Sequence, residues 1–210
     1  MSLKDRLKIP LHRGWVEIFV AAAALLISAV SLWVGIRNEK AQEDLVSAST
    51  WPFLYAESSN ATLEGTQVIH MDVINSGVGP AKAETFEVFW NGKAWASADA
   101  LVGTCCGYKA YHFFSEGKPK RTTMLTGGVQ GTVIRAGETR AFLTLPLAAD
   151  DADVWGKLDK ARLKMSFRIC YCSVFNQCWT STFSGIVPKN GQLHPARVKK
   201  CPVPKVPFLQ

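Results

Sequence analysis

The sequence is poor in charge and in histidine, and it lacks the common motifs of catalysis and nucleotide binding. Charged residues make up 20% of the 210 residues, and histidine occurs four times. No Gly-x-Ser-x-Gly, His-Glu-x-x-His or phosphate-binding glycine loop is present, so nothing indicates a serine hydrolase, a zinc protease or a P-loop nucleotide-binding site. A Cys-x-x-Cys at the start of a helix is missing as well. We therefore expect a protein that is not an enzyme, with no catalytic residues, no metal and no cofactor.

Long apolar runs are absent except for one. Apolar residues make up 48% of the chain, which is ordinary globular usage and excludes both a wholly disordered chain and a membrane protein with many spans. The length suits one domain with additions. The net charge is +7, an excess that suits a membrane surface as well as a nucleic acid. We do not expect a nucleic-acid partner.

The one long run, Ile18–Ile36, has 19 residues without a charge. As a helix it measures roughly 28 Å, close to the thickness of the hydrocarbon core of a bilayer. A cleaved signal peptide would have a shorter run with a small-residue cleavage site close behind it. We therefore predict an N-terminal segment over 1–14 and an uncleaved transmembrane helix over 15–36, with the lipid bilayer as a partner.

The flanking charges predict how this helix is oriented. Four basic residues precede the run and two follow it beside acidic neighbours: Lys4, Arg6, Lys8 and Arg13 before, Arg37 and Lys40 after. The positive-inside rule places the N-terminus in the cytoplasm and exports the rest of the chain. Six cysteines agree with an oxidising compartment. The predicted location is the inner membrane of a bacterium, with the C-terminal domain in the periplasm.

One line along the predicted span carries small residues and one acid. It consists of Glu17, Ala21, Ala24, Ser28, Ser31 and Gly35. At about 100° per residue these positions stay on one face, and small residues let a second membrane helix approach closely. The line is either a contact surface for another membrane or envelope protein, or for a second copy of this chain, or the background composition of a weak span.

After the span the sequence changes period. A polar stretch over 37–50 predicts a juxtamembrane helix, and Pro52 ends it. Within 51–188, apolar and polar residues alternate in short β-type runs bounded by turn formers. The predicted strands are 52–57, 67–75, 84–90, 108–114, 131–135, 139–145, 162–172 and 178–184. One short helix is expected over Ala149–Ala161, capped by Asp150 or Asp151.

This pattern predicts a mainly β fold. Several short strands separated by turns are typical of an immunoglobulin-like β-sandwich, with a barrel as the competing architecture. The segment 189–210 carries four prolines and is expected to run as an irregular arm over the surface. The sequence therefore predicts an N-terminal transmembrane helix followed by a β-sandwich that is braced by disulfides.

Turn formers gather between two of the predicted strands, at Asn75-Ser76-Gly77-Val78-Gly79-Pro80. We expect Gly77 or Gly79 to adopt a positive φ that only glycine takes cheaply, and Pro80 to set the start of the next strand. The motif is thus expected to be an element of the fold. Asn91-Gly92 predicts a two-residue hairpin turn.

Strand parity places some of the cysteines. Because alternate side chains face opposite ways, Cys170 and Cys172 share the outer face of their strand, and Cys178 returns on the same face. We therefore expect a disulfide between Cys172 and Cys178 across the hairpin loop. Adjacent cysteines rarely bond to each other, so we expect the remaining pair to take separate partners: Cys105 and Cys106 with Cys170 and Cys201.

The cysteines also allow a functional interpretation. Cys170 and Cys172, with Cys105 and Cys106, are candidates for a soft-metal site or a thiol–disulfide exchange site. Structural disulfides are the simpler interpretation, because the histidines are scattered and no ligand cluster is evident. His70 and Asp72 share a strand face, and we expect them to be solvated.

Three motifs carry a resemblance. After a basic N-terminus and a single span, the chain carries three motifs in order. They are Trp51-Pro52-Phe53-Leu54, the Asn75–Ala81 turn, and Cys170-Tyr171-Cys172-Ser173-Val174 with Cys178-Trp179. In this order the chain resembles an uncharacterised family of bacterial single-pass inner-membrane proteins with an exported β-domain. The resemblance implies location and architecture and no activity.

These features together predict a non-catalytic function. We expect a membrane-anchored periplasmic module that acts as an accessory or protein-interaction domain of the bacterial envelope. The alternative is a periplasmic protein that handles metals or thiols through its cysteines.

The predicted orientation has a direct test. A reporter that is active only in the cytoplasm, joined by a flexible linker after Gln210, should be silent, because the positive-inside rule exports that end of the chain. The same reporter fused before Met1 should be active and serves as the control. Reporter activity after Gln210 would reverse the orientation and remove the compartment on which the cysteine argument depends.

Overall fold

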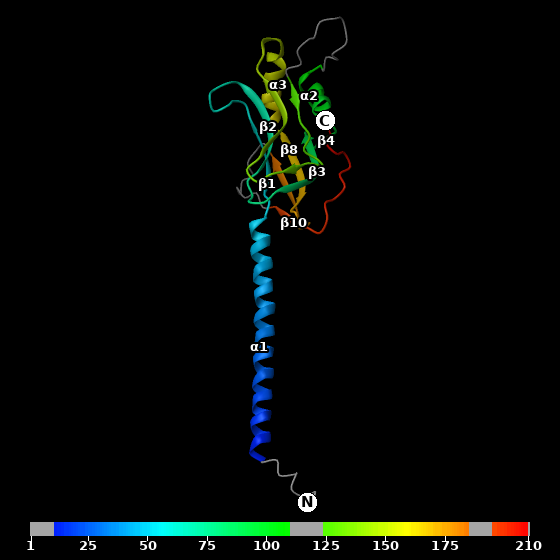
Figure 1. Ribbon diagram of the computed structural model, residues 1–210. Coiled ribbons are helices and arrows are strands. Elements are labelled where there is room, and N and C mark those ends of the chain that lie inside the picture. Colours follow the sequence, from blue (N-terminus) through cyan, green and yellow to red (C-terminus); the bar gives the residue numbers. More distant parts are fainter. Residues whose placement is uncertain (1–10, 110–123, 185–194, 210) are drawn as a thin grey trace, which may run out of the picture. The chain divides into compact units, whose positions relative to one another are not determined.

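The computed structural model describes residues 11–109, 124–184 and 195–209. The chain divides into two compact units, Met1–Ala48 and Ser49–Gln210. The first is helical, and the second, called the body below, is built mainly from strands (Figure 1).

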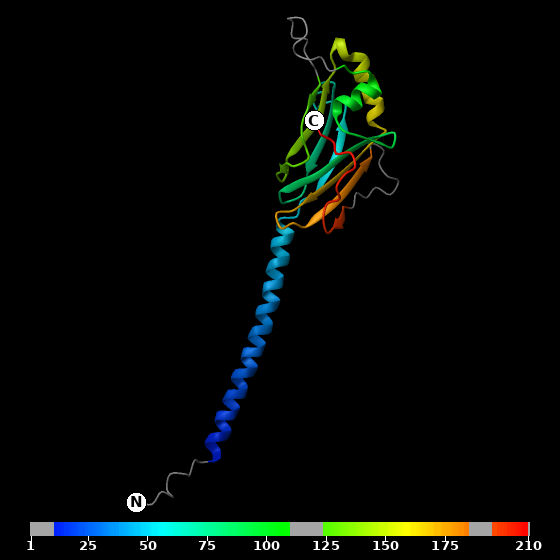
Figure 2. The same cartoon turned by 90° about the vertical axis from the view of Figure 1, so that its right-hand side faces the viewer.

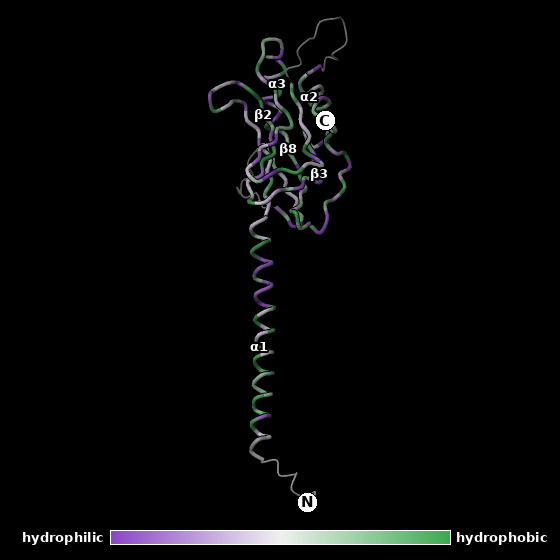
Figure 3. The backbone as a smooth tube through the Cα atoms, in the orientation of Figure 1, coloured by the Kyte–Doolittle hydropathy of each residue, from purple (hydrophilic) through white to green (hydrophobic). Residues whose placement is uncertain are grey.

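The described part of the N-terminal unit lies in a single continuous helix, α1 (Leu11–Ser49), of 39 residues. The stretches expected as a span over 15–36 and a juxtamembrane helix over 37–50 are therefore one element. Figure 3 shows apolar turns followed by polar turns along α1. The part Gly14–Ser49 is long and apolar enough to cross a membrane, and its most apolar stretch is not buried by any described residue. Phe19 and Leu25, for example, are 68% and 72% exposed. One long apolar helix of this kind is a candidate membrane span.

The body contains two antiparallel sheets, as the mainly β prediction requires. The first has the strand order β1-β2-β7-β5 and the second has the order β10-β9-β8-β3-β4, with β6 paired to β3. The strands of the first sheet are β1 (Leu54–Ser59), β2 (Val68–Asn75), β5 (Leu125–Thr126) and β7 (Thr139–Pro146). The strands of the second are β3 (Ala81–Trp90), β4 (Lys93–Trp95), β6 (Val133–Ile134), β8 (Met165–Cys172), β9 (Cys178–Ser184) and β10 (Ala196–Val198).

The core lies between the two sheets and centres on aromatic rings. Phe86 of β3 lies 5.0 Å from Phe142 of β7, so the two sheets meet through an edge-on ring contact. Phe167 of β8 and Phe208 of the C-terminal segment join this cluster, with ring centroids 5.5 Å and 5.9 Å from Phe142. Each of these side chains is at most 5% exposed. Burying a phenylalanine side chain contributes about 1.5–3 kcal/mol, so the cluster is a main source of the body's stability.

Two helices lie side by side at one end of the body, as Figures 1 and 2 show. The helix α3 (Ala152–Arg162), preceded by the 3-10 turn η2 (Ala149–Asp151), is the expected one. Asp151 occupies its N-cap position, but its side chain makes no capping hydrogen bond. The helix α2 (Ala98–Cys106) was not expected. Its signals are Ser97, which accepts a capping hydrogen bond from Ala100 N, and a left-handed Gly107 at its end.

The run 108–114 is predicted to be a strand, and only its first two residues, Tyr108 and Lys109, are described; neither has strand conformation. Residues 110–114 of that run lie outside the described residues. Gly107 ends α2 and turns the chain directly before it, which the alternation of aromatic residues did not signal.

The turn between β2 and β3 is organised by a buried side chain, Asn75. Its Oδ1 accepts hydrogen bonds from Phe53 N and Gly77 N, at 3.2 Å and 3.0 Å. Its Nδ2 donates to Gly79 O and Ile134 O, at 2.9 Å and 3.0 Å. The amide thus fills its hydrogen-bonding capacity while fully buried. Asn75 joins the entry to β1, its own turn and β6.

The two glycines of this turn are required for a reason other than the expected one. Neither Gly77 nor Gly79 has a positive φ, so that expectation is wrong. A Cβ on Gly77 would lie within 3.0 Å of the backbone of Trp51 and Phe53, and one on Gly79 would collide in the same way with the backbone of Thr50. The backbone preceding β1 packs directly on the turn, which leaves no room for a side chain. Pro80 immediately precedes β3, as expected.

The other expected turn is confirmed. Asn91 and Gly92 have φ values of 50° and 76° and connect β3 to β4. Positive φ at both positions is the geometry of the two-residue hairpin that this dipeptide predicts.

The C-terminal segment is irregular only in part. It forms β10, which pairs with β9, and then crosses to the core. Phe208 N donates to Phe86 O at 2.9 Å, and Leu209 N donates to Ala96 O at 2.7 Å. The prediction of an irregular surface arm is therefore wrong for residues 195–209. These residues are fixed to the second sheet, because Phe208 fills a place in the aromatic cluster. Residues 189–194 lie outside the described part.

The close packing at Gly79 predicts the effect of a single methyl group. Gly79→Ala should lower the melting temperature of the detergent-solubilised chain, because the added Cβ forces the Thr50 backbone away and overpacking of this kind costs about 1–3 kcal/mol. The readout is near-ultraviolet circular dichroism during heating.

The matched control is Gly156→Ala in α3, where a Cβ meets nothing within 4 Å. Alanine is favoured over glycine inside a helix by about 1 kcal/mol, so this variant should be as stable as the parent or more stable. Equal melting temperatures for Gly79→Ala and the parent would show that the turn tolerates a side chain and would contradict the role of Gly79 as an element of the fold.

Candidate functional site: two adjacent disulfides

All six cysteines lie in the described part of the chain and all are paired. The disulfides are Cys105–Cys106, Cys170–Cys201 and Cys172–Cys178. The structure thus brings four of the six candidate cysteines together at the β8–β9 hairpin and leaves the other two on α2.

The hairpin disulfide follows the strand parity. Cys172 and Cys178 are directly opposite each other in the β8–β9 register, and they are bonded as expected. The loop between them is held from inside by Ser173, whose N donates to Gln177 O at 2.8 Å. Its Oγ also accepts from Phe175 N and Gln177 N. The disulfide and the buried serine close the same short loop.

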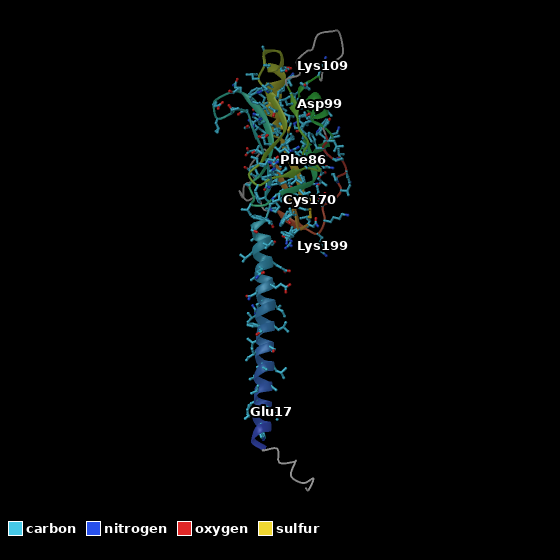
Figure 4. All side chains as sticks on the ribbon, in the orientation of Figure 1. Glu17, Phe86, Asp99, Lys109, Cys170 and Lys199 are labelled. Carbon is cyan, nitrogen blue, oxygen red and sulfur yellow. A yellow bond between two sulfur atoms is a disulfide. The ribbon has the colours of Figure 1, made fainter. Side chains whose placement is uncertain are left out.

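The second expectation about the cysteines is wrong: Cys105 and Cys106 bond to each other. The reason lies in the topology. The helix α2 follows β4, and β4 pairs with the end of β3 that also faces Met165 at the start of β8. Cys170 lies toward the other end of β8, about 17 Å along a strand from Met165. Figure 4 shows this separation between Asp99 of α2 and Cys170.

Cys170 is instead paired with Cys201, which the chain after β10 carries to it. The four sulfurs of the two disulfides are close neighbours, because Cys172 Sγ lies 3.9 Å from Cys201 Sγ without a bond between them. Cys172, Cys178 and Cys201 have their Sγ atoms within 4.8 Å of one another. We call this group of Cys170, Cys172, Cys178 and Cys201 the sulfur cluster.

The strand face that carries the sulfur cluster is covered, although parity alone suggested an outer face. Cys170 is 1% exposed and Cys172 is 4% exposed. The covering comes from the C-terminal segment around Cys201, whose attachment brings its chain over this part of the second sheet. Cys201 itself is half-buried and is the most accessible member of the cluster.

A pocket of about 470 Å³ opens beside the sulfur cluster. Cys172, Cys178 and Cys201 all line it, together with Lys199 and Lys200. Both lysines are exposed, and Figure 4 shows Lys199 at the same end of the body as Cys170. The acidic residue of the lining is Glu84, and Lys82 Nζ holds its carboxylate at 2.8 Å. The lysines therefore give the pocket a positive character.

This arrangement limits what the cysteines can bind. Metal coordination requires free thiolates, and in this state every sulfur of the cluster is in a disulfide. The set weighed from the sequence, Cys105, Cys106, Cys170 and Cys172, is divided between α2 and β8. Sequence reasoning missed Cys201 as a member of the site, because nothing in a proline-rich tail predicts which strand it will cross.

On α1, the line of Glu17, Ala21, Ala24, Ser28, Ser31 and Gly35 lies on an exposed helix surface. Ser28 Oγ donates to Ala24 O at 2.8 Å, so this hydroxyl is satisfied within the helix. A Cβ on Gly35 would meet nothing within 4 Å. Contact of this line with another helix remains a prediction.

His70 and Asp72 are half-buried on β2, more enclosed than the solvated pair expected from the sequence. Thr144 Oγ1 lies 3.3 Å from His70 Nδ1, and Glu57 faces Asp72 across the β1–β2 pair. Burial raises the pKa of Asp72 above its usual value; His70 opposes this rise and Glu57 adds to it. The charged form of Asp72 is thus disfavoured in the folded state.

No family model matches the sequence, and no curated protein matches it either.

The raised pKa of Asp72 gives a prediction whose sign depends on pH. The folded state binds the proton of Asp72 more tightly than the unfolded chain does, so this stability is present at low pH and is lost as the pH rises through the folded pKa. Asp72→Asn, which cannot ionise, should therefore raise the melting temperature at pH 7 and leave it unchanged near pH 3.

Asp153→Asn is the control, because Asp153 is exposed on α3 and pairs with Lys157. It should not stabilise the protein at either pH. A lower melting temperature for Asp72→Asn at pH 7 would mean that the charged carboxylate is needed by its neighbours.

Proposed function

We propose that this protein is a non-catalytic accessory or protein-interaction module of the bacterial envelope. The helix α1 anchors it in the inner membrane with its N-terminus in the cytoplasm, and the body is displayed in the periplasm. The body belongs to the immunoglobulin-like class of β-sandwiches in this proposal. The resemblance to single-pass bacterial proteins with an exported β-domain points the same way.

The observation that carries the proposal is the exposed apolar surface of α1. Trp15, Phe19, Leu25 and Trp33 are 60% or more exposed, and a soluble protein rarely leaves an apolar surface of this extent uncovered. A bilayer is the solvent that such a helix fits.

The disulfides support export of the body. All six cysteines are paired, and disulfides persist in oxidising compartments and are rare in the cytosol. The basic residues before the span, Lys4, Arg6, Lys8 and Arg13, favour the same orientation. Anchor, flanking charge and cysteine chemistry are independent observations that agree.

An interaction role suits the rest of the chain. The polar interior groups that the described residues contain, such as Asn75, hold the fold together, and the core is closed by aromatic rings. The surface that α1 offers to a partner is the line of small residues, where backbones can approach closely in lipid.

The helix line provides the test. Ser28→Leu combined with Gly35→Leu should leave insertion intact, since hydrophobicity rises, and should abolish association with the partner helix. The readout is covalent complexes of the full chain after crosslinking in native membranes.

The matched control is Ala22→Leu with Ala29→Leu, which adds similar bulk on other faces of the helix at about 100° per residue. These changes should leave the complexes unchanged. If the complexes persist equally in all variants, α1 is a plain anchor and recognition resides in the body alone.

A further inference from the structure

We propose that the sulfur cluster is a two-electron thiol–disulfide exchange site that oxidises a dithiol. The proposal goes beyond an interaction module and rests on one contact. Cys172 Sγ and Cys201 Sγ belong to different disulfides but lie 3.9 Å apart. A thiolate at either position therefore has the other disulfide within reach, and exchange proceeds by attack of a thiolate on a disulfide sulfur.

Access to the cluster is through the pocket. Cys201 is the most exposed of the four sulfur-bearing residues, so an incoming thiolate meets it first. Lys199 and Lys200 line the same pocket, and positive charge near a thiol favours its thiolate form. The substrate class in this proposal is a dithiol, such as two reduced cysteines of an exported protein, because its second thiol can resolve the mixed disulfide.

The first half of the reaction consumes the dithiol. One of its thiolates attacks Cys201 Sγ, which breaks the Cys170–Cys201 bond and releases the Cys170 thiolate. The second thiolate of the dithiol then attacks its own sulfur in the mixed disulfide and releases Cys201. The dithiol leaves as a disulfide, having lost two electrons and two protons.

The second half is internal. The Cys201 thiolate attacks Cys172 Sγ, which breaks Cys172–Cys178 and forms Cys172–Cys201. Electrons are conserved in this step, and the two protons reside on Cys170 and Cys178. The product has taken up two electrons, yet the C-terminal segment is still bonded to β8. Cys178 and the hairpin loop are released instead.

The experiment detects the exchanged bond directly. The full chain carrying Cys105→Ser and Cys106→Ser, which removes the competing disulfide of α2, receives one equivalent of dithiothreitol per chain. The reaction is quenched with acid, and free thiols are alkylated. Trypsin and chymotrypsin then separate all four cysteines, because Tyr171 lies between Cys170 and Cys172, and Phe175 between Cys172 and Cys178.

The expected product is a peptide pair linked through Cys172 and Cys201, with Cys170 and Cys178 alkylated. Recovery only of the original disulfides, or of either original disulfide fully reduced without any Cys172–Cys201 link, would overturn the proposal. If the double variant does not fold, the same mapping is done on the parent chain at increasing dithiothreitol concentration. The parent chain needs no substitution, and absence of the Cys172–Cys201 link there would likewise overturn the proposal.

A second variant tests the internal step alone. Cys178→Ser leaves Cys172 as a thiol beside the intact Cys170–Cys201 bond, and exchange should then produce Cys172–Cys201 with Cys170 free, in the absence of reductant. The control is His70→Ala, on the first sheet, which should retain only the native pairs. A Cys178→Ser chain in which Cys172 stays fully alkylatable and Cys201 stays on Cys170 would refute the exchange, whatever becomes of the interaction module.

Discussion

The body depends on a single buried amide. Asn75 links three backbone segments through its side chain: the entry to β1, the turn into β3, and β6. A buried polar side chain is costly unless all of its hydrogen bonds are made, so this residue stabilises only the one arrangement in which its four partners converge. The glycines beside it serve the same arrangement by letting the backbone before β1 lie directly on the turn. The hydrogen bonds of Asn75 thus hold the two sheets together at one end, and the aromatic cluster holds them together between their faces.

Local features of this fold were readable from residues. Features that depend on neighbours in sequence were predictable, because the hydrophobic period and the strand parity determine them. These features are the alternation in β2, β3, β7, β8 and β9, the Asn91-Gly92 hairpin and the Cys172–Cys178 disulfide. The long helix followed from composition. The features that could not be predicted depend on contacts between segments that are distant in the sequence. Gly79 was recognised as special, but its reason is the Thr50 backbone, which only the tertiary structure brings there.

The candidate site was predictable in its chemistry and not in its membership. Strand parity placed three cysteines on one hairpin, whereas Cys201 reaches Cys170 across 31 positions of sequence. Closing a loop of that length contributes about 3–4 kcal/mol in the chain-entropy account. The bond between Cys105 and Cys106 is local, and it was missed because the preference against adjacent pairs outweighed a topological fact, the position of α2 at the far end of β8. The preference against a disulfide between adjacent cysteines does not decide the pairing when no other cysteine is within reach.

Phe208 has a consequence for how the chain is made. It packs against Phe86 and Phe142 in the aromatic cluster, although every described strand of the body precedes it in the sequence. The aromatic cluster is therefore incomplete until Phe208 has been synthesised and has reached the core. The described strands can pair before that point, but they do so around an unfilled place in the core. Chaperones that hold unfolded chains can bind during that interval, and the loss of Phe208 acts on the interior of the protein as a large-to-small core substitution would.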